Sequence, residues 1–98
     1  MEINSRQRAY LRGKAMQMDS ILQIGKSGIG PEYIQAIDEA LEARELIKIN
    51  VLKNCTDDPK ELAIVAAEHT RSILVQVIGR RIVLFRQAKE NTRYPLPR

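Results

Sequence analysis

The sequence is short of the side chains that most often carry catalysis or bind metal ions. Among 98 residues there is one cysteine, Cys55, one histidine, His69, and no tryptophan. Zinc sites usually draw on four cysteine or histidine ligands, so we expect no metal site, and no cofactor is indicated. A single cysteine cannot form an internal disulfide, which agrees with a reducing compartment.

Long apolar runs are lacking as well. Runs such as "IVLF" at residues 82–85 are far shorter than the roughly 20 residues that a bilayer crossing needs. The N-terminal segment has no apolar stretch of the secretory type, although its arginines leave an organellar transit peptide open. We therefore expect a cytoplasmic protein with no membrane partner.

Positive charge is concentrated near the two ends of the chain and negative charge in between. Residues 1–30 hold five lysines and arginines against two acids, and residues 79–98 hold six against one. Residues 31–45 hold five acids against one arginine. If the fold brings the two ends together, they form a cationic face suited to a phosphate backbone. A mildly basic domain can also owe its charge to solubility alone, so the charge leaves both interpretations open.

Three segments have helical features and four have strand features. Helices are predicted in residues 4–18, after capping residue Asn4 or Ser5, and from the prolines Pro31 and Pro59 onward. Strands are predicted in residues 20–24 and 45–52 and in the two apolar runs of residues 72–87, which Gly79 and Arg80 separate as in a tight hairpin.

The resulting order, α-β-α-β-α-β-β, predicts a compact single α/β domain spanning residues 1–98. We expect a four-stranded mixed sheet packed with three helices. The crossover helices favour parallel neighbours for the first three strands, and the last pair is an antiparallel hairpin. Residues 91–98, "NTRYPLPR", are broken by prolines and predict an extended tail.

Two pairs of side chains invite a catalytic interpretation. Cys55 and His69 are compatible with a nucleophile pair, but a loop cysteine and a half-buried histidine are the favoured explanation. Asp57 and Asp58 are adjacent, yet Asp58 stands before a proline, where helix capping is the simpler role. We therefore predict no enzyme activity and no catalytic residue.

The stretch "QIGKSGIGPEY" at residues 23–33 places a glycine-rich loop between a strand and a helix. Its spacing fits neither a Walker loop nor the G-x-G-x-x-G dinucleotide motif. What remains is G-x-x-G, as "GKSG" at residues 25–28, in which glycines admit backbone amides close to an anion. K-homology domains clamp nucleic-acid backbone with this spacing, although there the loop joins two helices. An ordinary strand-to-helix turn is the alternative.

Several motifs together resemble the CRM domain family, named for chloroplast RNA splicing and ribosome maturation, in its free-standing bacterial, YhbY-like form. They are "QIGKSGI", "ELIKINVL", "VQVIGRRIVLFR" and the terminal "LPR". The resemblance implies a fold like the C-terminal domain of a bacterial translation initiation factor. It also implies RNA binding without catalysis, on precursor large ribosomal subunits. By position it implies that Gly25, Lys26, Ser27 and Gly28 contact RNA.

The predicted partner is therefore RNA, specifically rRNA of the precursor large ribosomal subunit, bound by a monomer with no small-molecule substrate. We expect the basic surface to be extended by cations of the first helix, namely Arg6, Arg8, Arg12 and Lys14. We also expect cations from both chain ends to flank the GKSG loop. Aromatic residues are too few for a base-stacking platform, so recognition should run through phosphates.

Other interpretations stay open at this point. A protein-interaction module would use the acidic second helix, whose acids are Glu32, Asp38, Glu39 and Glu42. An RNA-modifying enzyme is a third candidate. DNA binding is also compatible, because phosphate contacts alone do not separate it from RNA binding.

Overall fold

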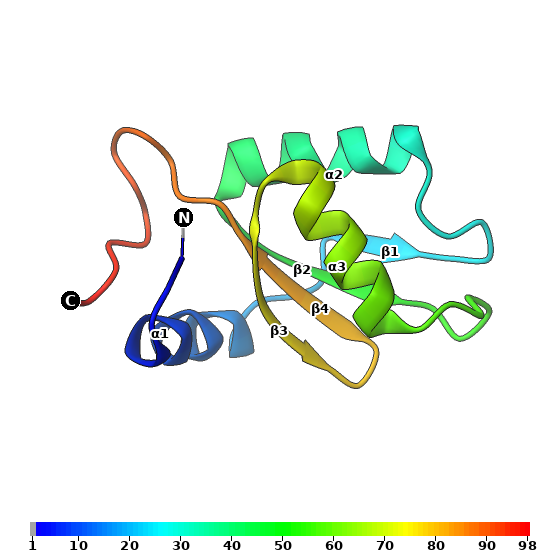
Figure 1. The fold of residues 1–98 in the computed structure, drawn as a ribbon, viewed down its shortest axis with the longest axis horizontal. Coiled ribbons are helices and arrows are strands. Elements are labelled where there is room, and N and C mark those ends of the chain that lie inside the picture. Colours follow the sequence, from blue (N-terminus) through cyan, green and yellow to red (C-terminus); the bar gives the residue numbers. More distant parts are fainter. Residues whose placement is uncertain (1) are drawn as a thin grey trace.

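A computed structural model of the chain describes residues 2–98, which form one compact domain of three helices and four strands (Figure 1). In chain order these are α1 (Ser5–Met16), β1 (Leu22–Ile24), α2 (Pro31–Arg44), β2 (Leu46–Val51), α3 (Pro59–Thr70), β3 (Ile73–Ile78) and β4 (Arg81–Phe85). The predicted order and the four-stranded mixed sheet are confirmed. None of these helices has the length and apolar character needed to cross a membrane.

The helices begin where the capping residues predict. At α1 the Asn4 side chain accepts a hydrogen bond from the Gln7 amide, and the Gln7 side chain accepts one from the Asn4 amide. At α3 the Asp58 carboxylate accepts a hydrogen bond from the Lys60 amide at 3.0 Å. α2 begins directly at Pro31, where the missing N–H of proline costs nothing.

The strands lie in the order β1-β2-β4-β3, with β1 parallel to β2 and β4 antiparallel to both of its neighbours. The expectation that the first three strands are parallel neighbours is therefore wrong for β2 and β3, because β4 lies between them. Residues 82–85 of β4 are all buried, whereas β3 is mostly half-buried and is irregular between Leu74 and Gln76. The strand that is apolar on both faces takes the centre, where both of its edges are paired.

The two faces of the sheet pack against different elements. Ile47, Ile49 and Val51 of β2 join the larger core, which lies beneath α2 and α3. On the opposite face α1 buries Leu11 and Ala15 against a smaller core. The alternation of β2 thus places successive residues on opposite faces, as its sequence predicts.

The C-terminal tail, residues 91–98, has no helix or strand and is held by hydrogen bonds and by packing. The buried carboxylate of Glu45 accepts hydrogen bonds from the Thr92 hydroxyl at 2.6 Å and from the Arg93 amide at 3.0 Å. The ring of Tyr94 meets that of Phe85 edge to face, with centroids 6.2 Å apart. The tail thereby packs beside α1 on the smaller core.

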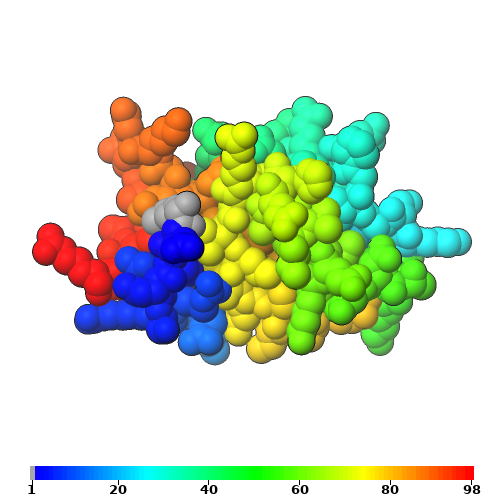
Figure 2. Space-filling view, in the orientation of Figure 1, coloured from blue at the N-terminus to red at the C-terminus, as the bar shows by residue number. Residues whose placement is uncertain are grey.

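The two ends of the sheet carry different parts of the chain (Figure 1). The β1–α2 loop, the β2–α3 loop and the β3–β4 turn meet at what we call the loop end. The start of α1 and the C-terminal tail lie at the opposite end, which we call the terminal end. In the space-filling view the cyan residues of the loop end project at one edge, far from the blue and red residues of the two termini (Figure 2).

Candidate nucleic-acid interface

The GKSG loop (residues 25–28) is a tight turn at the loop end. The amide of Gly28 donates a hydrogen bond to the carbonyl of Gly25 at 3.0 Å, which closes the turn. Lys26 and Ser27 form its tip, and both are exposed. The turn therefore presents one ammonium group and one hydroxyl to solvent.

The two glycines of this loop are not equivalent. Gly28 has a φ of +68°, in the left-handed region, and a Cβ there would lie 3.1 Å from Oδ2 of Asp57. A Cβ on Gly25 would make ordinary contacts, the nearest at 3.7 Å from the Leu52 side chain. A side chain at position 28 is therefore strained, whereas position 25 has space for a methyl group.

The first turn of α2 follows the loop and has no side-chain cap. Its N-cap residue is Gly30, which offers no acceptor to the first-turn amides. Those amides, together with the helix dipole, favour an anion at this position. Glu32 in the same turn and Asp57 beside Gly28 act in the opposite direction. Binding of an anion at this position would therefore rely on hydrogen-bond donors in direct contact with it and not on a net positive charge of the surroundings.

Arg80 holds the neighbouring β2–α3 loop in place. Its guanidinium donates hydrogen bonds to the carbonyls of Val51 at 2.9 Å, Leu52 at 2.6 Å and Cys55 at 3.1 Å. Leu52 in turn contacts the position of Gly25, so Arg80 supports the GKSG loop indirectly. The sequence showed Arg80 only as a hairpin residue, because nothing local indicates that its side chain reaches another loop.

The cations predicted on α1 have separate roles. Arg8 donates to the carbonyls of Leu74 at 2.6 Å and Val75 at 2.7 Å, where β3 is irregular. Lys14 lies with its Nζ atom 5.6 Å from the ring centre of Tyr10, and Arg6 is exposed.

These α1 cations do not flank the GKSG loop. α1 lies toward the terminal end, and the loop lies at the far end of the long axis (Figure 1). The expectation that cations from both chain ends surround the loop is therefore wrong for the N-terminal set. Of the C-terminal cations, Arg80 and Arg81 of the β3–β4 hairpin lie at the loop end, while Arg93 follows the tail to the terminal end.

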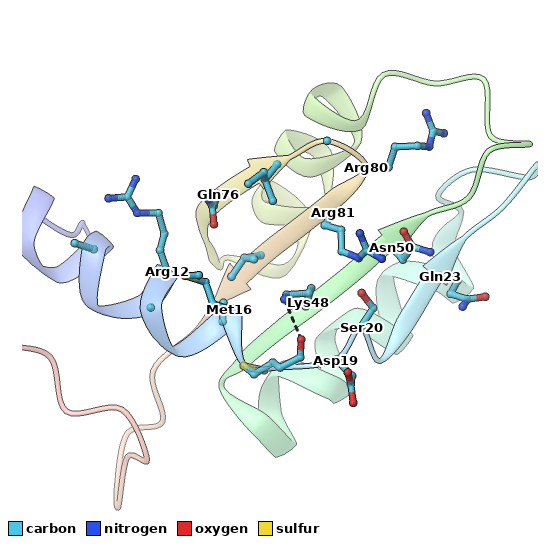
Figure 3. Close-up of a pocket in the computed structure, with 17 residues that line it drawn as sticks. Arg12, Met16, Asp19, Ser20, Gln23, Lys48, Asn50, Gln76, Arg80 and Arg81 are labelled. Carbon is cyan, nitrogen blue, oxygen red and sulfur yellow. Dashed lines mark hydrogen bonds between the residues drawn. The ribbon is translucent and has the colours of Figure 1, made fainter.

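Arg12 differs from the other cations of α1 because it lines a groove on the sheet face that α1 leaves uncovered (Figure 3). Lys48, Asn50 and Arg81 of the sheet line the same groove. In the sequence Lys48 and Asn50 alternate with isoleucine and valine residues, which predicts a polar side of the strand but indicates no role for it. The strand register, which brings them beside Arg81, is the signal that would have identified them.

The residues weighed for catalysis are not arranged as a nucleophile pair. Cys55 is buried just before α3, and His69 is exposed near the opposite end of the same helix. The predicted half-burial of His69 is therefore wrong. Within residues 2–98 no group of three or more histidine, cysteine, aspartate or glutamate side chains is placed to hold a metal ion.

The acidic side of α2 is partly neutralised within the molecule. Arg86 forms ion pairs with Asp38 at 2.6 Å and with Glu42 at 3.3 Å, and also donates to the carbonyl of Thr70 at 2.7 Å. Two of the four acids considered for a protein interface are therefore engaged.

Comparison with known proteins gives consistent results. The model of the CRS1/YhbY (CRM) domain matches residues 3–86. A Bacillus subtilis (strain 168) protein named "Probable RNA-binding protein YqeI" is 45% identical over 95 residues, which are 97% of this chain and 99% of that protein. A Haemophilus influenzae protein named "RNA-binding protein" is 31% identical over 97 residues, or 98% and 96% of the two chains.

A solved structure is similar over the same extent. The solution structure of SAV1595 from Staphylococcus aureus, assigned provisionally to RNA binding, superposes with a TM-score of 0.83 at 52% identity. The match covers 98% of this chain and 100% of that one.

Proposed function

Because the chain belongs to the CRS1/YhbY (CRM) domain family, we propose that it binds folded RNA through the phosphate backbone, with the GKSG loop as the central contact. The observation that carries this proposal is the exposed pair Lys26 and Ser27 at the tip of a turn whose left-handed residue is Gly28. A lysine, a hydroxyl and nearby uncapped amides are the donors that a phosphate accepts.

The positions of the aromatic residues support backbone recognition over base stacking. Phe85 is fully buried, Tyr94 packs on it, and Tyr33 packs against the larger core. Tyr10 is half-buried against the smaller core beneath Lys14. A base-stacking platform needs aromatic rings exposed on a sheet, whereas these four rings pack against other side chains of the protein.

The loop is tested by removing its lysine. Lys26→Ala is expected to weaken binding to a structured RNA about fivefold and to lower the slope of log affinity against log salt by about 1. Lys89→Ala, which removes an exposed lysine outside the loop end, serves as the matched control and should change neither quantity. Equal losses in the two variants would show that the loop has no special role.

A second variant, at a residue of the β2–α3 loop that lies beside Gly28, should change the RNA affinity in the opposite direction. Asp57→Asn removes the negative charge beside Gly28 while keeping the size of the side chain. RNA affinity should rise about twofold to fivefold, because a phosphate at the loop no longer meets a carboxylate. An unchanged affinity would place the bound phosphate away from Gly28.

We further propose that the RNA partner is rRNA of the precursor large ribosomal subunit. The resemblance of the glycine loop and the closing hairpin to the YhbY-like form supports this choice. In gradient sedimentation of cell extracts the wild-type protein should travel with precursor large subunits, and Lys26→Ala should shift toward the free fraction. Sedimentation with small subunits alone would contradict the proposal.

The acidic helix offers a separate test of the protein-interaction alternative. Glu32→Lys combined with Glu39→Lys reverses two exposed charges that have no ion pair among residues 2–98. Under direct RNA binding this double variant keeps or increases its affinity for ribosomal precursors. Loss of association, with binding to purified RNA unchanged, would favour the protein-interaction function.

A further inference from the structure

A groove of about 1010 Å³ lies between the last turns of α1 and the sheet face opposite α2 and α3 (Figure 3). It exists because α1 buries only Leu11 and Ala15, against the half of the sheet that contains Leu46 and Phe85. Gly13 on its wall adds no side chain, and the space beside it is open. Its volume is at the upper end of ordinary ligand pockets, about 300–1,000 Å³.

The floor of the groove is a row of paired residues that crosses all four strands and is polar on β1, β2 and β4. Gln23 pairs in register with Asn50, Asn50 pairs with Arg81, and Arg81 pairs with Ile78. All four residues line the groove. Amide side chains such as Gln23 and Asn50 both donate and accept hydrogen bonds, which suits the edges of unpaired bases.

The walls of the groove are cationic. Arg12, Lys48 and Arg81 line it, together with one acid, Asp19. Arg80 also borders the groove, but its guanidinium is turned to the carbonyls of the β2–α3 loop. Among residues 2–98 both ion pairs belong to Arg86, so none of the cations of the groove forms an ion pair. Lys48 donates one hydrogen bond to the carbonyl of Met18 at 2.9 Å, which fixes its position and leaves other donors available.

Two large apolar side chains are exposed at the same groove. Met16 is 81% exposed and Ile78 is 60% exposed, and they are the two most exposed of the large hydrophobic residues of the described chain. The apolar side chains can contact the faces of bases, the amides can bond to the edges of bases, and the cations can bind phosphates. A continuous RNA duplex keeps the faces of its bases stacked inside the helix and would leave Met16 and Ile78 unused.

We infer that the groove binds an unpaired segment of the RNA that the GKSG loop holds. Gln23 stands two residues before Gly25 on the same chain, so the polar row ends directly beside the loop. A strand whose phosphate is held at Lys26 can therefore continue across the sheet toward Arg12. The inference rests on the proposed RNA binding and adds to it the single-stranded character of part of the ligand.

The test compares two RNA probes, a blunt hairpin and the same hairpin with a single-stranded extension of about six nucleotides. The wild-type protein is expected to bind the extended hairpin about tenfold tighter than the blunt one. Arg81→Ala and Asn50→Ala should each remove most of this preference and leave the affinity for the blunt hairpin unchanged. Lys26→Ala should weaken binding of both probes.

Controls separate the groove from general charge and from folding. Arg93→Ala removes an exposed arginine at the terminal end and should leave the preference intact. Arg81→Lys keeps the charge at the groove and should keep more of the preference than Arg81→Ala. Thermal unfolding shows whether each variant is folded. If Arg81→Ala fails to fold, Asn50→Ala and Arg81→Lys still test the inference.

The outcomes that overturn the inference are distinct from those that overturn the proposed function. Equal binding of the two probes by the wild type, or equal losses on both probes in Arg81→Ala, would remove the groove from the RNA interface and leave the loop proposal standing. Equal binding of the two probes, combined with binding of a poly-glutamate peptide that Arg81→Ala abolishes, would make the groove a peptide site. Failure to bind either probe would defeat the proposed function itself.

Discussion

The two ends of the sheet both carry arginines and lysines, but they use them differently. At the terminal end the guanidinium groups of Arg8 and Arg86 donate hydrogen bonds to backbone carbonyls, and Arg86 also pairs with carboxylates. Glu45 accepts a hydrogen bond from the tail.

At the loop end Arg80 is engaged in the same way, by backbone carbonyls, whereas Lys26 and Arg81 are exposed and have no ion pair among the described residues. Arg6 and Arg93 are also exposed and unpaired within residues 2–98, but at the terminal end. Counting cations therefore does not locate a binding surface. The loop end differs because its free lysine, Lys26, lies in a glycine turn next to the uncapped first turn of α2.

The largest expected effect on the free energy of unfolding comes from a substitution at the terminal end, Arg86→Ala. Arg86→Ala removes the ion pair to Asp38 and the hydrogen bond to the carbonyl of Thr70 from a side chain that is 22% exposed. Hydrogen bonds to charged groups are worth about 1.5–3 kcal/mol, so the free energy of unfolding should fall by about 2–3 kcal/mol. Urea denaturation measures this loss, while RNA affinity should stay unchanged.

The matched control is Arg44→Ala, at the exposed last turn of α2, which should cost no more than about 0.5 kcal/mol. If Arg86→Ala kept its stability and instead lost RNA affinity, the division between a structural end and a binding end would be mistaken.

A smaller effect is expected in the GKSG loop, where the two glycines can be compared directly. Gly28→Ala places a Cβ at a φ of +68° and 3.1 Å from Asp57, which should destabilise the protein by about 1–2 kcal/mol. Gly25→Ala places its Cβ at ordinary contact distance and should leave the free energy of unfolding nearly unchanged. Gly28→Asn should recover part of the loss, since asparagine tolerates the left-handed region. Equal losses at the two positions in urea denaturation would contradict this assignment.

Local signals in the sequence account for what was predicted well. Asn4, Pro31 and Pro59 mark helix starts because capping and the first helical turn depend on neighbouring residues. The glycine loop and the hairpin at Gly79 and Arg80 are found for the same reason. The resemblance to the CRM family, which rests on these motifs, is confirmed by the family match.

Long-range arrangement is what the sequence did not determine. The insertion of β4 between β2 and β3 depends on which strand is buried on both faces, a property of the whole sheet. The position of α1 away from the loop and the row of Gln23, Asn50 and Arg81 depend on that strand order. The contacts of Arg8 and Arg80 with distant carbonyls leave no mark near those residues in the chain. The distribution of charged residues along the sequence therefore did not predict where free cations lie on the surface of the folded protein.

The smallest expected effect concerns Tyr33 in the first turn of α2, at the loop end. Its hydroxyl is buried and has no hydrogen-bond partner among the described residues, and burial raises the pKa of Tyr33 from 10.0 to about 12. Tyr33→Phe removes the unpaired hydroxyl and keeps the ring, so it should stabilise the protein by up to about 1 kcal/mol near neutral pH. Urea denaturation of the two proteins at pH 8 measures this difference.

The same pair of proteins gives a test by pH. Between pH 10 and pH 12 the tyrosine of the unfolded wild type loses its proton while Tyr33 in the folded protein keeps it, so ionisation stabilises the unfolded state. The wild type should therefore lose stability relative to Tyr33→Phe as the pH rises through this window, and the advantage of the phenylalanine variant should be larger at pH 11 than at pH 8. The two proteins differ only at residue 33, so all other contributions to the pH dependence cancel in the difference. A stability difference that does not change with pH would mean that the Tyr33 hydroxyl reaches solvent. The loop end would then contain no unfavourably buried hydroxyl at this position.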